Sequence, residues 1–214
     1  MCLDITLNNT HCAYKVEDGR PKYNLVWRYM SAGQDLATEV AFAAATKYLW
    51  PEDAETATNL GVGYFICGKL DHAVKLLQQA VGFDPCYTPA RYHLGRAYMC
   101  QGQYQEAVRS LEIAVLFEPG HAYAAIHLGL AYHATGRVDM AHAVLAAVRR
   151  RWPDCPEVLL ALACAYRAGE QPCAALDCLA RVLAVAPADE AVVWRARRLL
   201  TAIEYEESTV HSRV

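Results

Sequence analysis

The stretch RYHLGRAYMCQGQYQEAVRSLEIAVLFEP, from Arg91 to Pro119, decides the fold of this chain. It holds two runs of apolar residues spaced three and four apart, which is the period of a helix with one buried side. The first run is Leu94, Ala97 and Tyr98, and the second is Ala107, Leu111 and Ala114. Gly102 lies between the runs, where glycine is suited to ending a helix. The stretch therefore predicts two helices joined by a short turn.

The same pattern recurs along the chain every 34 residues. The repeated positions hold Leu60, Leu94, Leu128 and Leu162; Gly61, Gly95, Gly129 and Ala163; Tyr64, Tyr98, Tyr132 and Tyr166; Ala73, Ala107, Ala141 and Ala175; Leu77, Leu111, Leu145 and Leu179; and Pro51, Pro85, Pro119, Pro153 and Pro187. One helical pair cannot bury its own apolar face, so we expect the copies to stack on one another.

A 34-residue period of leucine-glycine, tyrosine, alanine and proline resembles the tetratricopeptide repeat. The resemblance covers residues 54–189 in four copies: 54–87, 88–121, 122–155 and 156–189. It implies an all-α fold, a right-handed solenoid of stacked helix-turn-helix pairs.

The repeated small residues and prolines have a physical reason in such a fold. Gly95 and Ala107 lack bulk where the two helices of a pair cross, so the backbones can approach closely. Pro119 cannot continue the second helix and ends it. Thr88 is a plausible N-cap, because its hydroxyl could accept a hydrogen bond from the first turn.

The ends of the array depart from the pattern. Residues 20–53 fit the register only in part, with Trp27 where glycine is expected, and they predict a divergent helical pair at about 21–30 and 35–49. Apolar residues at helical spacing after Pro187 predict a capping helix over 190–206, which covers the last repeat. Composition predicts loosely ordered tails over 1–19 and 207–214.

In the tetratricopeptide family, the first helices of successive pairs line a concave groove that binds peptides. By this resemblance the groove is lined by Phe65, Tyr92, His93, Arg96, Met99, Tyr123, His127, Leu130, His133 and Arg167, and Thr58, Val62, Glu157, Leu160 and Cys164 share its face. Tyrosine and arginine are favoured interface anchors, so the lining suits an extended peptide or a partner helix. For Leu160 and Cys164 we expect packing against neighbouring side chains instead.

Other site chemistries have little support in the sequence. The carboxylate clamp of the family, made of lysine, asparagine and arginine, is absent, because the matching positions hold Thr58, Val62, His93, Tyr123 and His127. No HxxxH or CxxC pair occurs, so we expect no metal site and no cofactor. Cys67, Cys100 and Cys164 are interpreted as small apolar fillers. We expect structural or solvated roles for Arg149, Arg150 and Arg151 at a helix end.

The bulk composition excludes several classes of protein. Of the 214 residues, 55% are apolar and 20% charged, which predicts an ordered chain. A formal net charge of −3 disfavours nucleic-acid binding through phosphates. There is no run of the ~18 apolar residues that a membrane span needs and no secretory signal, so we expect a cytoplasmic protein with reduced thiols.

These features predict a non-catalytic scaffold or adaptor that binds a protein segment in its groove. The architecture is similar to that of stand-alone bacterial tetratricopeptide scaffolds such as the magnetosome-associated protein. A client-holding chaperone of type III secretion is the alternative, although such chaperones usually have about three repeats. The imperfect N-terminal pair, the apolar composition and the small net charge also suggest a homo-oligomer formed through residues 20–53.

Overall fold

The computed structural model describes residues 53–211, and within this part of the chain all regular structure is α-helical. Side chains are described for residues 53–203. The helices are α3 (Ala54–Ile66), α4 (Leu70–Phe83), α5 (Thr88–Cys100), α6 (Tyr104–Phe117), α7 (Ala122–Ala134), α8 (Val138–Arg151), α9 (Pro156–Ala168), α10 (Pro172–Val185) and α11 (Glu190–His211). The expected tail at 1–19 lies outside the described residues, as does all of the expected pair at 20–53 except Asp53.

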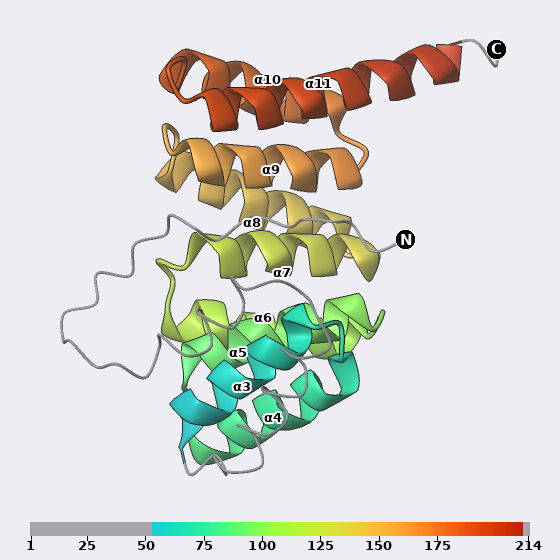
Figure 1. Cartoon of the computed structure of the whole chain (residues 1–214). Helices are drawn as coiled ribbons and strands as arrows, with labels where there is room; N and C mark the ends of the chain where they lie inside the picture. The colour runs from blue at the N-terminus through green and yellow to red at the C-terminus, as the bar shows by residue number, and fades with distance from the viewer. Residues whose placement is uncertain (1–52, 212–214) are drawn as a thin grey trace. The chain divides into compact units, whose positions relative to one another are not determined.

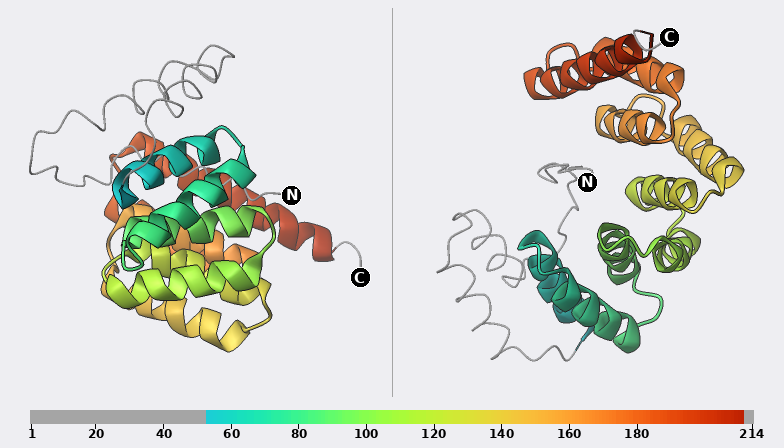
Figure 2. Two further views of the ribbon diagram at one scale, coloured as in Figure 1. Left: turned by 90° about the horizontal axis from the view of Figure 1, so that it is seen from below. Right: turned by 90° about the vertical axis from the view of Figure 1, so that its right-hand side faces the viewer.

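The chain divides into two units after Glu118. Unit 1 contains α3 to α6, and unit 2 contains α7 to α11 (Figure 1). In unit 1, α3 packs on α4, α5 on α6, and α4 on α5. In unit 2, α7 pairs with α8 and α9 with α10, and α11 lies against α10 and α9. The helical pairs are visible in both views of Figure 2. The prediction of an all-α repeat fold is confirmed.

The helices of a pair cross at the glycine that the sequence indicated. A Cβ atom built on Gly95 would lie 2.5 Å from Leu111 Cγ, closer than carbon atoms can approach. The equivalent distances are 2.7 Å for Gly61 against Leu77 and 2.8 Å for Gly129 against Leu145 Cγ. Leu111 and Ala107 are fully buried. Glycine therefore lets the leucine side chain of the second helix pack directly against the backbone of the first helix.

The turn inside each pair uses a left-handed residue at the same repeat position. Gly68, Gly102 and Gly136 have φ of 74°, 75° and 77°, and Glu170 has φ of 54°. The next residue closes the turn in each case; for example, Gln103 N–H donates to the Tyr98 carbonyl at 2.9 Å. This is the Schellman arrangement, which satisfies carbonyls at a helix end. The fourth pair achieves it without glycine.

Helix boundaries differ from expectation at two places. Thr88 is the first helical residue of α5 rather than its N-cap, because Tyr87 precedes the helix and no side chain caps it. Asp53 is a side-chain cap, since its carboxylate accepts from Thr56 N–H at 2.6 Å. Pro119 follows α6 by two residues, so its predicted role in ending the helix fits the structure.

Helix α11 is longer than the predicted capping helix and runs on to His211. The predicted tail over 207–214 is therefore wrong for residues 207–211. No glycine or proline interrupts the sequence from Glu190 onward, so nothing local ends the helix earlier. Val192, Ala196 and Ile203 are buried, and α11 contacts both α10 and α9, as expected of a cap.

Candidate protein-binding surface

Three of the predicted groove residues meet in unit 1. The guanidinium carbon of Arg96 on α5 lies 4.9 Å from the centre of the Phe65 ring on α3 and 5.6 Å from that of Tyr92. Phe65 also packs against the buried cluster of α4 and α5 that contains Leu77 and Leu94. A cation that contacts two ring faces is held in a restricted position. We call Phe65, Tyr92 and Arg96 the Arg96 site.

The other predicted residues of α5 differ in exposure around this site. Tyr92 is buried, with 7% of its surface exposed, whereas Phe65, His93, Arg96 and Met99 are half-buried. The rings of Tyr92 and His93 are tilted by 58° with centres 4.9 Å apart. Tyr92 thus contacts the guanidinium from the buried side, while Phe65 and Arg96 keep solvent-accessible surface.

In unit 2 the predicted residues of α7 are mostly held by local contacts. His127 and Leu130 are buried, and Tyr123 and His133 are half-buried. His127 Nδ1 lies 2.7 Å from the Tyr123 carbonyl oxygen and donates to it, since a carbonyl can only accept. The His133 ring reaches α9, 3.5 Å from where a Cβ on Gly169 would lie. Sequence spacing alone could not distinguish these packed side chains from exposed ones.

On α9, Arg167 and Glu157 are half-buried at the same face. Leu160 is 2% exposed, which confirms the expectation that it packs against neighbours. Cys164 is half-buried, and burial raises the pKa of its thiol. The α9 face therefore presents two charged side chains and a thiol.

The remaining histidine of α7 has a structural role. His121 precedes the helix, and its Nδ1 accepts a hydrogen bond from Ala124 N–H at 3.0 Å. The ring thus caps the N-terminus in place of serine or aspartate. Among the residues that the structure describes, no three His, Cys, Asp or Glu side chains gather closely enough to hold a metal ion.

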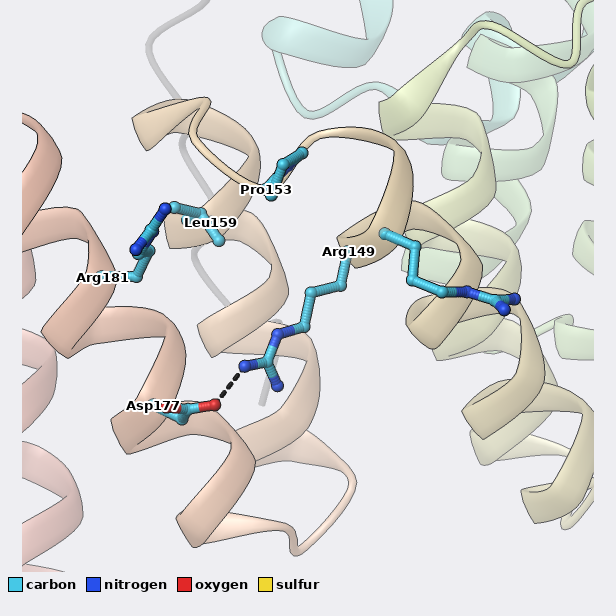
Figure 3. Close-up of a pocket in the computed structure, with 6 residues that line it drawn as sticks. Arg149, Pro153, Leu159, Asp177 and Arg181 are labelled. Atoms are coloured by element: carbon cyan, nitrogen blue, oxygen red, sulfur yellow. Dashed lines mark hydrogen bonds and ion pairs between the residues drawn. The ribbon is translucent and has the colours of Figure 1, made fainter.

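The run of arginines at the end of α8 borders a cleft of about 390 Å³ in unit 2 (Figure 3). Its lining includes side chains of α8, α9 and α10: Arg149, Arg150, Pro153, Leu159, Asp177 and Arg181. Arg149 donates to the Asp177 carboxylate, and this hydrogen bond raises the pKa of the guanidinium. Arg181 Nε donates to Asp154 at 2.9 Å.

These ion pairs give the arginines of the cleft a structural role, as expected. Arg149 and Arg181 are each neutralised by a carboxylate, and Arg151 lies over the Trp152 ring with its guanidinium carbon 5.1 Å from the ring centre. Arg150 is exposed and has no such partner in the described part of the chain. The cleft is therefore a weak candidate for an anion site.

The described cysteines range from exposed to fully buried. Cys67, directly after α3, and Cys100, the last residue of α5, are exposed, so their interpretation as apolar fillers is wrong. The sequence placed them beside the turn glycine, where the helix end faces solvent. Cys178 is fully buried on α10, and burial raises its pKa to about 11. It is the thiol that fills the core.

Family comparison agrees with the geometry. Two family models described as tetratricopeptide repeat match residues 54–82 and 92–156. These two segments therefore carry tetratricopeptide repeats, and the resemblance seen in the sequence is confirmed. No curated protein sequence matches the chain. None of the described helices is long and apolar enough to cross a membrane.

Solved structures share the fold. A thermophilic TPR protein of Thermus thermophilus has 25% identity and a TM-score of 0.67, and the similarity covers 84% of this chain and 97% of that one. A putative kinesin light chain of Podosopora anserina with nearly identical TPR-like repeats has 28% identity and a TM-score of 0.60, covering 80% and 96%. MamA, at 23% identity and a TM-score of 0.58 over 74% and 92%, shows the fold alone.

Proposed function

We propose that this chain is a non-catalytic scaffold that binds a segment of a partner protein on the first-helix face of its repeats. The observation that carries the proposal is the Arg96 site, because two aromatic rings hold one guanidinium at a half-buried surface. Such a guanidinium loses little side-chain entropy on binding. The matches to tetratricopeptide repeat models support it, because stacked repeats of this kind form extended concave surfaces that bind other proteins.

The Arg96 site suits a partner segment with an acceptor group beside an apolar side chain. Arg96 can donate to a carboxylate or a backbone carbonyl. Phe65 and Met99 offer apolar contact area next to it, and aromatic residues and arginine commonly dominate interface energetics. In unit 2, Tyr123, His133 and Arg167 are among the half-buried residues of the corresponding face.

Site-specific photocrosslinking tests which face is used. A photoreactive amino acid at Phe65 or Met99 should crosslink the partner in cells, whereas the same group at the exposed Gln79 on α4 should not. Arg96→Gln should weaken partner binding about tenfold, through loss of a charge-assisted contact. Arg109→Gln, an equal charge change at an exposed position on α6, is the matched control. Crosslinks from Gln79 alone would mean that the proposed face is wrong.

Three further expectations stay predictions. The homo-oligomer through residues 20–53 lies outside the described residues; light scattering over a range of concentrations, with and without residues 1–53, would test it. The secretion-chaperone alternative predicts a tight complex with one apolar client, and the cytoplasmic location can be tested by cell fractionation. No observation favours the chaperone over the scaffold.

A further inference from the structure

The exposed side of α11 carries a tryptophan with an arginine over its ring. Trp194 is 60% exposed, and the Arg198 guanidinium carbon lies 5.4 Å from the centre of its ring. The buried residues Val192, Ala196 and Ile203 lie on the opposite side of the helix, given 3.6 residues per turn. Burial of these three residues explains why α11 packs on the last repeat, but it does not explain why a tryptophan lies on the exposed side.

The pair Trp194 and Arg198 repeats the pair Tyr92 and Arg96 at a distance of three whole repeats. Both pairs combine an aromatic ring with an arginine one helical turn later, and both place the guanidinium over the ring, at 5.4 Å and 5.6 Å. Helix α11 thus keeps the register of a first helix, including its aromatic and cationic positions. It differs from α5 because its tryptophan is exposed rather than buried.

The described part of this surface carries an excess of positive charge. Arg195, Arg197 and Arg198 are half-buried or exposed, and none has a carboxylate partner among the described residues. Glu190 is the one other charged side chain in the described part of α11. Asp189, just before the helix, is engaged in capping, because its carboxylate accepts hydrogen bonds from the N–H groups of Ala191 and Val192 at 3.1 Å. By contrast, Arg149 and Arg181 in the same unit are both paired.

We propose that Trp194 with Arg195, Arg197 and Arg198 forms a second binding site, which takes an acidic segment of a partner protein. Carboxylates of the segment pair with the three guanidiniums, and an apolar side chain of the segment packs on the part of the Trp194 ring that Arg198 leaves open. Exposed tryptophan and arginine are the residues most often found at interface hot spots. The site is separate from the Arg96 site and does not depend on the function proposed above.

Isothermal titration with two synthetic blocked peptides tests the site. The acidic probe is Asp-Glu-Phe-Glu-Asp, and the neutral probe is Asn-Gln-Phe-Gln-Asn. The full chain should bind the acidic probe, more weakly as salt is added, because exposed charges are screened. Arg197→Gln/Arg198→Gln should weaken binding about tenfold or more. The matched control Arg109→Gln/Arg150→Gln removes the same charge from exposed positions on α6 and α8 and should change little.

Variants at Trp194 separate recognition from structure. Trp194→Phe should keep binding within about threefold, whereas Trp194→Ala should lose about tenfold, because only phenylalanine preserves an aromatic face. Circular dichroism should be unchanged in both, since the ring is exposed. Absence of binding, equal binding of both probes, or equal loss in both double variants would overturn the proposal. So would self-association that the arginine variant abolishes, because the occupant would then be a second copy.

Discussion

The α5/α6 pair and the α9/α10 pair follow the same 34-residue pattern but differ at two positions where glycine is otherwise used. At the crossing, α5 has Gly95 and α9 has Ala163; at the turn, the first pair has Gly102 and the other has Glu170. Both pairs nevertheless form, with their leucines Leu111 and Leu179 fully buried. The comparison teaches that the buried leucine is common to both pairs, whereas the residues at the two glycine positions alter the stability of each pair.

The largest expected effect comes from removing that leucine. Leu111→Ala and Leu179→Ala should each lower the free energy of unfolding by about 3 kcal/mol, because each leaves a cavity in a fully buried site. Urea unfolding followed by circular dichroism measures both. A loss below about 1 kcal/mol in one pair alone would show that the two pairs are not equivalent at this position.

A pH effect is expected in the α9/α10 pair. Burial raises the pKa of Cys178 to about 11, whereas an unfolded thiol titrates near 9.0. Between these values the unfolded chain has lost this proton and the folded chain has kept it, so stability falls as pH rises through the window. The loss is about 2 kcal/mol. Comparing unfolding at pH ~8 and ~11 with that of Cys178→Ala isolates the thiol, since the variant should lack this part of the decline.

Exchanging the crossing residues should destabilise both pairs. Gly95→Ala places a Cβ 2.5 Å from Leu111 Cγ, and we expect a net cost of about 1 kcal/mol after the gain in helix propensity. Ala163→Gly should cost about 1 kcal/mol, because glycine is the poorer helix former. In a double-mutant cycle, Gly95→Ala should cost less in a Leu111→Ala background. An additive cycle would mean that Leu111 does not cause the cost.

The smallest expected effect concerns the turn. Glu170→Gly should stabilise the protein by about 0.5–1 kcal/mol, because φ of 54° is unfavourable for a residue with a side chain. The reverse change, Gly102→Glu, should destabilise by a similar amount. Thermal unfolding of the two variants would show midpoints that move in opposite directions. A shift to lower temperature for Glu170→Gly would indicate that the glutamate side chain supports the turn.

The sequence was sufficient for the parts of the fold that depend on local period. Leu94, Gly95 and Gly102 recur with the repeat, and each position has one physical requirement: burial, close approach or positive φ. The left-handed Glu170 could not be foreseen from its type, because glutamate rarely adopts this conformation. It follows from the hydrogen bond that Gln171 N–H donates to the Tyr166 carbonyl at 2.8 Å.

The candidate sites depended on contacts between distant residues, and fewer of their features were visible in advance. The register placed Phe65 and Arg96 on one face, but their contact across 31 positions is tertiary. The burial of His127 depends on how α7 packs, which the residue type does not encode. The apolar spacing after Pro187 predicted the buried side of α11, whereas the placement of Arg198 over the exposed Trp194 ring is visible only in the structure.

Helix α11 begins at the position where a fifth repeat would begin, and it has the register of a first helix. Unequal recombination that duplicated one 34-residue repeat before Glu190 would lengthen the protein and still place the same tryptophan and arginines after the fourth of the present repeats. The gene could therefore change the number of repeats between its two candidate sites one at a time, while the residues of both sites stay the same.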